Sequence, residues 1–338
     1  MFLKHHQTKF SILLLLVSLT FLLNLSLGQV AIPFLEVVHF ILGKKLPQET
    51  WHYILLDFRL PKAITALLVG SGLSICGLLM QTFFRNPMAG PYVLGLSSGS
   101  SLGVAILLLG SEIFSLHYIS SQIGIATASF MGSLFVLLLI VLVSRKLKDT
   151  MSILIVGLMF SSFTSAFVSV LTYFSTAEQL QRFTFWSMGN LANMSWEQVL
   201  QLALWVCSGT FLAFLVNKPL DALLLGENYA KSMGVNISKT RWIIIFSSSI
   251  LAGSITALVG PIAFVGLAVP HIAKLMFHTS NHKVLFFATL LLGSLSMLIC
   301  DTISQLPGQS FMIPINAITS LFGAPIVIYL LINKNRTW

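Results

Sequence analysis

The sequence predicts an all-α integral membrane protein with about ten transmembrane helices in an inverted-repeat-like arrangement. Of its 338 residues, 56% are hydrophobic and only 9% are charged, whereas soluble domains carry about 25% charged residues. Long windows contain no Asp, Glu, Lys or Arg, which suits a bilayer core, because one charge at its centre costs about 2.5–3.5 kcal/mol on insertion scales. We therefore expect one transmembrane domain over residues 1–338.

The charge-free windows place the helices, since each holds a span of about twenty residues. Gly260-Pro261 divides one window that is too long for a single helix. The first apolar run has a cleaved signal peptide as its alternative, but it is long for one and LSLGQ is a poor cleavage site. The expected helices cover 10–28, 63–83, 93–110, 119–143, 151–174, 197–217, 241–259, 262–277, 284–301 and 314–333.

Basic residues predict the orientation. With ten spans and a cytoplasmic N-terminus, the C-terminus is also cytoplasmic, and only five of the 19 lysines and arginines lie outside: Lys44, Lys45, Arg59, Lys62 and Arg182. A cytoplasmic excess of basic residues is the bias of correctly oriented membrane proteins. The same bias explains the net charge of +9 without a nucleic-acid partner.

Three segments between the spans have recognisable patterns. The segment 29–58 is amphipathic in places and is expected to lie along the outer interface as short helices. FWSMGNLANMSW (185–196) predicts a cap or partial helix at the mouth of a cavity, with simple aromatic anchoring as the alternative. The cytoplasmic segment 217–240 predicts two short helices joined at a glycine turn, a shape suited to docking in a partner's groove or to an ordinary connector.

Two Gly-Pro turns suggest an internal repeat. GPYVLGL at 90–96 resembles GPIAFVGL at 260–267, and each follows a glycine-bearing helix. In the predicted topology those two helices run in opposite directions, which is a common plan in transporters. Glycines of the second and third helices predict close helix packing first and a pore second.

Ionisable residues limit the chemistry. No span carries a carboxylate or a lysine near its middle, which argues against ion-coupled transport and against a membrane protease or oxidoreductase. The phosphate-binding pattern GxxxxGK[ST] is absent, and its nearest approach, residues 234–240, lacks the glycine before the lysine. The histidines at 271, 278 and 282 predict no metal site, because a loop separates the last two. A transporter subunit that is driven by separate ATPase subunits fits both absences. We therefore expect no cofactor in this chain, with ATP and Mg²⁺ bound by those subunits.

Six motifs, in order along nearly the whole chain, resemble the FecCD family of ABC-transporter permeases. The motifs are RLPK (59–62), QTFFRNPMAGPYVLGLSSGSSLG (81–103), FWSMGN (185–190), LLLGENYAKSMGVN (223–236), GPIAFVGLAVPHIAK (260–274) and IPINAITSLFGAPIVIYLL (313–331). Members of this family import ferric siderophores, haem or cobalamin across the bacterial inner membrane.

The resemblance implies a type II ABC importer permease that is not itself an enzyme. It forms a homodimer in the lipid membrane, binds two cytoplasmic ATPase subunits, and receives cargo from a periplasmic or lipid-anchored binding protein. The implied sites are binding-protein docking at Arg59, Lys62 and Gln305; ATPase coupling at Leu225, Gly226, Glu227, Ala230, Met233 and Gly234; a cytoplasmic gate at Asp149, Thr150 and Met151; and pathway or packing positions at Asn86, Pro87, Gly95, Ser97, Ser98 and Gly99.

Four positions depart from the family pattern. Lys62 and Gln305 stand where arginines are common, so the docking pocket is less positive. Gly90 replaces a common acidic residue and Asp149 a small polar residue, and neither exchange has a physical explanation. The expected cargo is an iron chelate such as a ferric siderophore, by family frequency, with cobalamin and haem as alternatives. An ion-coupled secondary transporter is the alternative from another class.

Single cysteines test the orientation. Lys45→Cys and Lys146→Cys are introduced separately into a chain lacking its three native cysteines. A membrane-impermeant maleimide added to intact cells should label position 45 and not position 146, because the two lie on opposite sides of the membrane. Equal labelling of both from outside would contradict the predicted topology.

Overall fold

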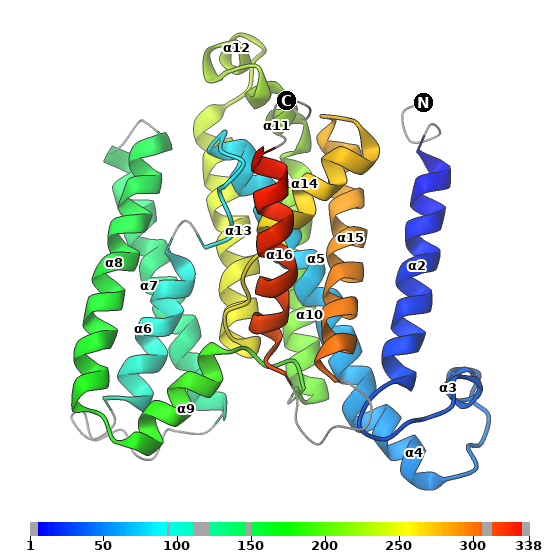
Figure 1. The fold of residues 1–338 in the computed structure, drawn as a ribbon. Helices are drawn as coiled ribbons and strands as arrows, with labels where there is room; N and C mark the ends of the chain where they lie inside the picture. Colours follow the sequence, from blue (N-terminus) through cyan, green and yellow to red (C-terminus); the bar gives the residue numbers. More distant parts are fainter. Residues whose placement is uncertain are drawn as a thin grey trace. The chain divides into compact units, whose positions relative to one another are not determined.

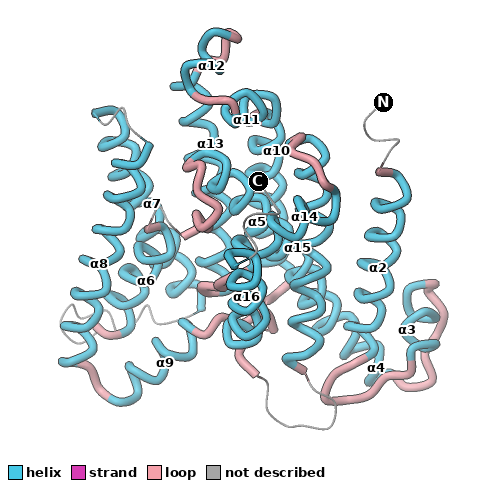
Figure 2. Tube along the Cα trace, turned by 45° about the horizontal axis from the view of Figure 1, so that its top comes forward, coloured by secondary structure: helices cyan, strands magenta, loops and turns pink. Residues whose placement is uncertain are grey.

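A computed structural model describes residues 6–92, 95–110, 122–146, 150–192, 194–305 and 313–332 (Figure 1). Every regular element in these ranges is a helix, and none of the described residues forms a strand (Figure 2). The all-α fold class predicted from the sequence is confirmed.

Apolar helices lie at all ten predicted positions among the described residues. Seven are long and apolar enough to cross a membrane: α2 (Gln7–Ser26), α5 (Leu60–Phe83), α7 (Gln122–Lys146), α8 (Thr150–Phe174), α10 (Trp196–Leu215), α13 (Ile237–Val259) and α15 (His282–Ser304). Three are shorter: α6 (Leu96–Leu108), α14 (Val265–Phe277) and α16 (Ile315–Ile332). The short eighth helix, α14, contains Pro270 as the sequence indicated.

The segment before α5 forms the short helices expected of an amphipathic interfacial stretch. These are α3 (Phe34–Ile41) and α4 (Glu49–Tyr53). A π-helical turn over Ile54–Arg59 joins α4 to α5, so helix runs without interruption from Glu49 to Phe83. Trp196 Nε1 donates a hydrogen bond of 3.2 Å to the Leu56 carbonyl in this turn. A π turn shifts the positions of the following side chains around the helix axis. Arg59 is the last residue of this turn.

Contacts divide the chain into two compact units, and each combines separate parts of the sequence. Unit 1 comprises 1–75, 190–204 and 262–338, with α2, α3, α4, α14, α15 and α16. Unit 2 comprises 76–189 and 205–261; it holds α6 to α8, α9 (Ala177–Ser187), α11 (Asn217–Leu224), α12 (Glu227–Ser232) and α13. Helices α5 and α10 contribute residues to both units.

Among the described long helices three are mostly buried: α15 in unit 1, α13 in unit 2, and α5, which contributes to both units and lies in a helical stretch (Glu49–Phe83) whose apolar window is 83% buried. In unit 1, 67% of the apolar window of α15 is buried, against 17% for α2. In unit 2 the corresponding values are 72% for α13 and 17% for α8. The exposed helices present large apolar side chains, including Leu15 and Phe163, as expected of surfaces that contact lipid hydrocarbon.

Glycines bring the backbones of α6 and α7 into direct contact. A Cβ built on Gly132 would overlap the Gly99 carbonyl oxygen and lie 3.1 Å from the Gly103 nitrogen. A Cβ built on Gly103 would overlap the Ala128 carbonyl oxygen in the same way. Unit 1 repeats the arrangement where Gly70 of α5 meets Gly293 of α15. Small residues of this kind let membrane helices approach closely, so the predicted glycine packing is confirmed at these positions.

The two Gly-Pro turns have similar surroundings. Helix α5 is followed by the turn with Gly90-Pro91 and then by α6, which has 13 residues. Helix α13 ends at Gly260, whose φ of +87° favours glycine, and is followed by α14, also of 13 residues. The repeat suggested by the sequence therefore has a counterpart in the order and length of the helices.

Helix α9 lies earlier in the chain than the partial helix expected within 185–196. It begins with a capping box, in which Thr176 Oγ1 accepts a hydrogen bond from the Gln179 backbone N–H and Gln179 Oε1 accepts one from the Thr176 N–H. It ends at Ser187. The pattern Thr-x-x-Gln at 176–179 is a signal of helix start that would have placed it correctly.

Substituting Gly132 by alanine tests the contact between α6 and α7. Because the new methyl group would meet rigid backbone, Gly132→Ala should lower the free energy of unfolding by about 1–3 kcal/mol, the usual cost of overpacking. Gly253→Ala in α13 is the control, since its Cβ would meet only the Ser133 side chain, at 3.1 Å from Oγ. Equal thermal unfolding temperatures for the two variants in detergent would contradict this packing.

Candidate functional site

The segment 217–234 of unit 2 forms the two short helices that the sequence predicted. Helix α11 ends at Leu224, and α12 begins at Glu227 with Gly226 as its N-cap. Gly226 has a φ of +118° and Gly234, after α12, a φ of +82°. Side chains rarely adopt such backbone angles, which is why glycine suits both turns. We call residues 217–234 the α11–α12 segment.

Apolar side chains stand exposed on this segment. Leu225, Tyr229 and Met233 are 65%, 54% and 60% exposed, whereas Ala230 between them is completely buried. Helix α12 has the polar sequence ENYAKS. Of the three exposed apolar residues, Tyr229 lies within this helix, and Leu225 and Met233 flank it. Exposed apolar groups with polar neighbours are characteristic of protein interaction surfaces. Five of the six predicted coupling residues thus lie in or beside this exposed group, and Ala230 supports it from inside.

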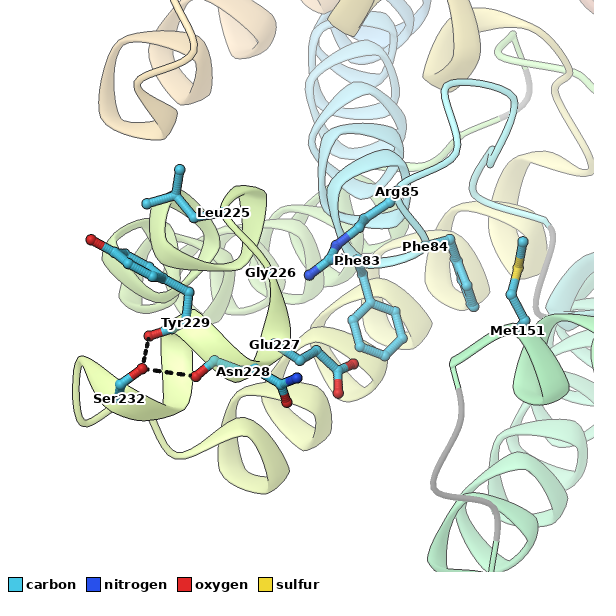
Figure 3. A pocket seen from close by; sticks show the side chains of 10 residues that line it. All are labelled: Phe83, Phe84, Arg85, Met151, Leu225, Gly226, Glu227, Asn228, Tyr229 and Ser232. Carbon is cyan, nitrogen blue, oxygen red and sulfur yellow. Dashed lines mark hydrogen bonds between the residues drawn. The ribbon is translucent and has the colours of Figure 1, made fainter.

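A pocket of about 930 Å³ opens beside the α11–α12 segment (Figure 3). Its walls are residues 83–85 at the end of α5, Met151 at the start of α8, and residues 225–229 and 232 of the segment. Of the predicted gate residues, Asp149 lies outside the described residues, Thr150 begins α8, and Met151 is exposed toward the pocket. Three of the predicted coupling positions, Leu225, Gly226 and Glu227, therefore share one pocket with the predicted gate position Met151.

Two polar contacts attach the α11–α12 segment to the long helices of unit 2. Arg85 Nη2 donates a hydrogen bond of 3.0 Å to the Leu223 carbonyl in the last turn of α11. Glu227 Oε1 lies 3.9 Å from Arg241 Nη2 in the first half of α13. The segment is consequently connected both to the end of α5 and to α13.

The predicted pathway and packing residues lead from Arg85 into α6. Asn86 Oδ1 accepts a hydrogen bond of 2.9 Å from the Met88 N–H, which closes the turn containing Pro87. Gly95 is the N-cap of α6 with a φ of +73°, and a Cβ there would lie 3.0 Å from the Gly157 carbonyl of α8. Ser97 and Ser98 are half-buried and Gly99 is buried. Asn86 and Pro87 thus lie in the turn after α5, and the other four positions shape the start of α6.

Unit 1 brings the three predicted docking residues together in a buried polar cluster. Arg59, Lys62 and Gln305 are only 7%, 6% and 7% exposed. We call them, with Asn24 and Asp301, the Asp301 cluster. A Cβ built on Gly28 would lie 2.8 Å from Arg59 Nη2 and 3.4 Å from Gln305 Oε1, which shows how closely these groups meet. The proximity of the three was expected, but their burial was not.

Asp301 is the acceptor at the centre of this cluster. Its Oδ1 lies 3.1 Å from Lys62 Nζ. Its Oδ2 accepts hydrogen bonds of 2.9 Å from both Asn24 Nδ2 and Gln305 Nε2. A buried carboxylate is tolerated when it is paired and hydrogen-bonded, and both oxygens of Asp301 are satisfied.

Arg59 bonds to backbone carbonyls near the end of α2 instead. Its Nη1 donates hydrogen bonds of 2.5 Å to Leu25 and 2.9 Å to Ser26, and its Nη2 donates to Val30. The last carbonyls of a helix have no partner within the helix and carry a partial negative charge, so a guanidinium is well placed there. Arg59 thereby fixes the turn after α2.

Asn24 and Asp301 were missed by reasoning from the sequence. Asp301 is the one charged residue of the sequence between 284 and 333. It lies four residues before Gln305, which places the two on the same face of a helix. Asn24 lies in the apolar run of the first helix. Isolated polar residues in such runs need a partner inside the protein, and that requirement was the available signal.

Comparisons with known proteins cover nearly the whole chain. Residues 14–333 match the model of the FecCD transport family. The molybdate import system permease protein MolB of Haemophilus influenzae is 32% identical over 93% of this chain and 92% of its own. The vitamin B12 import system permease protein BtuC of Vibrio parahaemolyticus is 31% identical over 92% of this chain and 94% of its own.

A solved structure agrees with the fold. It is an inward-facing conformation of a transporter assigned to the metal-chelate type of ABC transporter, and it is 30% identical to this chain. The comparison covers 97% of this chain and 99% of the other, with a TM-score of 0.84.

Neutralising Asp301 tests the buried cluster. Asp301→Asn keeps the acceptor for Asn24 and Gln305 but leaves the Lys62 ammonium without its counter-ion. The free energy of unfolding should fall by about 3–5 kcal/mol, the usual cost of breaking a buried pair. The double variant Lys62→Met with Asp301→Asn should recover much of this loss.

Glu178→Gln is the matched control in thermal or denaturant unfolding. Glu178 pairs with Arg182 at 3.0 Å, but both side chains are more than half exposed. Its loss should be less than about 1 kcal/mol, as for surface pairs. An Asp301→Asn loss no larger than that of Glu178→Gln would contradict a stabilising role for the cluster.

Proposed function

The chain belongs to the FecCD transport family of ABC importer permeases, and on that premise we propose that it carries an iron chelate, specifically a ferric siderophore. The transport would be driven by a separate ATPase, and the observation that carries this part of the proposal is the α11–α12 segment, with its exposed apolar side chains beside the pocket next to Arg85. Such a surface suits the attachment of a cytoplasmic ATPase.

Energy for transport comes from separate ATPase subunits in this proposal, because the sequence contains no phosphate-binding GxxxxGK[ST] loop. The ion-coupled alternative would have to use a titratable group inside the membrane domain. Lys62 and Asp301 form such a pair, but both Asp301 oxygens already hold partners within the chain. The geometry favours a structural use of this pair.

The 30% identical transporter assigned to the metal-chelate type supports a metal chelate as cargo, and the choice of iron among such chelates rests on family frequency. Cobalamin is an alternative because the vitamin B12 permease is 31% identical, and haem is another because a hemin transport system permease is 32% identical. The 32% identical molybdate permease adds an oxyanion to the candidates. Sequence identity does not separate these relatives, so the cargo is a matter for direct assay.

The proposed assembly is a homodimer in the cytoplasmic membrane with two ATPase subunits and a substrate-binding protein outside. Its N- and C-termini would be cytoplasmic, and Asp149 to Met151 would form the inner gate. Docking of the binding protein at Arg59 and Lys62 would require these buried side chains to exchange Asp301 and backbone carbonyls for carboxylates of the partner. Docking therefore includes a rearrangement of the Asp301 cluster.

Uptake into proteoliposomes tests the proposed function. The chain is reconstituted with its ATPase and binding protein, and a ferric hydroxamate, haemin, cyanocobalamin and molybdate are offered in competition. Uptake of the ferric hydroxamate should require ATP hydrolysis and should persist when ionophores collapse the ion gradients. Uptake that stops with ionophores and continues without ATPase would favour the ion-coupled alternative, and preference for another cargo would overturn the iron assignment.

Bulky substitutions at the glycine turns test the coupling role. Gly226→Leu and Gly234→Leu each place a side chain at a positive φ angle, so the α11–α12 segment should be distorted. ATP-driven uptake should then fall by about tenfold or more, because a misplacement of about 1 Å in a catalytic assembly has an effect of at least this size. Gly43→Leu is the control, because Gly43 also has a positive φ of +71° with no atom near its missing Cβ. Unchanged uptake in both segment variants would refute the role.

A further inference from the structure

Arg85 occupies a backbone position that ordinarily belongs to glycine. Helix α5 ends in a Schellman motif, in which the Asn86 N–H bonds to the Gln81 carbonyl and the Arg85 N–H bonds to the Thr82 carbonyl. Arg85 is the left-handed residue of this motif, with a φ of +47°. A side chain at such a position is strained, and strain of this kind points to a use for the side chain.

The side chain of Arg85 extends to the α11–α12 segment (Figure 3). Its Nη2 donates to the Leu223 carbonyl, which also accepts a hydrogen bond of 3.1 Å from the Gly226 N–H. A Cβ built on Gly226 would lie 3.9 Å from the same Nη2. The guanidinium thus lies beside the glycine turn and faces the partially negative end of α11, where a cation is favourable.

The described backbone after Arg85 continues to Tyr92, and α6 begins at Leu96 with Gly95 as its N-cap. Asn86 closes the next turn, and Gly95 starts α6 against the Gly157 carbonyl of α8. Helix α6 is in backbone contact with α7 through Gly99 and Gly132. Because such close contacts transmit displacement rather than absorb it, movement of the Arg85 turn would reach the helices of unit 2.

A second polar contact joins the segment to α13. Glu227 Oε1 and Arg241 Nη2 are 3.9 Å apart, whereas Arg85 Nη2 lies 3.0 Å from the Leu223 carbonyl oxygen, a normal hydrogen-bond length. The route through Arg241 is therefore tested separately from the route through Arg85.

We propose that Arg85 is the positioning residue that transmits ATP-driven movement of the α11–α12 segment to the turn leading into α6. The proposal rests on the proposed function, since it takes the ATPase to act on that segment. Arg85 touches neither nucleotide nor cargo in this scheme. It acts through the Leu223 carbonyl at one end and the turn of residues 85–88 at the other.

Maleimide labelling follows the transmission without any need to know the cargo. One cysteine is placed at exposed Met233 of the segment (Met233→Cys) and, separately, one at exposed Met88 beyond Arg85 (Met88→Cys), in a chain without native cysteines. Labelling rates are compared in the full complex with and without ATP, using an ATPase that binds but does not hydrolyse it. With Arg85 present, ATP should change the rate at both positions by about threefold or more, the scale on which single coupling residues act.

Arg85→Gly is the decisive variant, because glycine keeps the left-handed turn and removes only the side chain. It should leave ATPase binding and the ATP response at position 233 intact and abolish the response at position 88. Arg85→Lys, which retains a cationic donor, should restore most of the response at 88. Arg182→Ala, at an exposed arginine of α9, is the matched control and should change neither response.

The outcomes separate the possible failures. If the complex with Arg85 fails to bind the ATPase or shows no ATP response at position 233, the proposed function itself fails. If that response is present and Arg85→Gly leaves position 88 responsive, the transmission role is wrong. Loss of ATPase binding in Arg85→Gly would make Arg85 a docking residue and would overturn the proposal. Loss of the response at position 88 in Arg241→Ala, with that response retained in Arg85→Gly, would assign transmission to α13 and would also overturn it.

Discussion

Unpaired carbonyl groups at helix ends are the constraint on which much of this structure depends. Each helix leaves its last four carbonyls without a partner inside the helix, and water does not serve them in apolar surroundings. Among the described residues, three basic side chains donate to such carbonyls: Arg59 at the end of α2, Arg85 at the end of α11, and Lys9, whose Nζ donates a hydrogen bond of 2.6 Å to the Met276 carbonyl near the end of α14. The Ser26 and Leu223 carbonyls each accept a backbone N–H as well. Satisfying these carbonyls also joins helices that are distant in sequence.

Charge distribution, together with the Gly260-Pro261 turn that divides one long window, was enough to predict the ten apolar helices, because insertion into a bilayer excludes charges so strongly that their gaps mark the spans. The glycine turn at Gly226 was predictable as well, since it depends on local backbone geometry. Contacts between distant residues were not predictable. Arg59 and Lys62 looked like an outward docking pair, but Asp301 and the turn after α2 enclose them. Similarly, 138 residues separate Arg85 from Leu223.

Each unit thus contains one polar arrangement with a distinct consequence. In unit 1, the Asp301 cluster holds α2, α5 and α15 together by a satisfied carboxylate, and a partner that uses its cations has to displace existing bonds. In unit 2, a single arginine joins an exposed segment to the start of a glycine-packed helix. The first arrangement favours stability, whereas the second favours transmission, because only the second ends on an exposed and strained backbone.

The central claim is that a cytoplasmic ATPase binds this permease at the α11–α12 segment. Hydrogen exchange of the complete chain, measured with and without the ATPase, tests it directly, because exchange reports local opening and coverage of each helix. The amides of residues 217–236 should exchange more slowly when the ATPase is bound, while those of α3 (Phe34–Ile41) should be unchanged. Stable binding of the ATPase without slower exchange in residues 217–236 would contradict the claim.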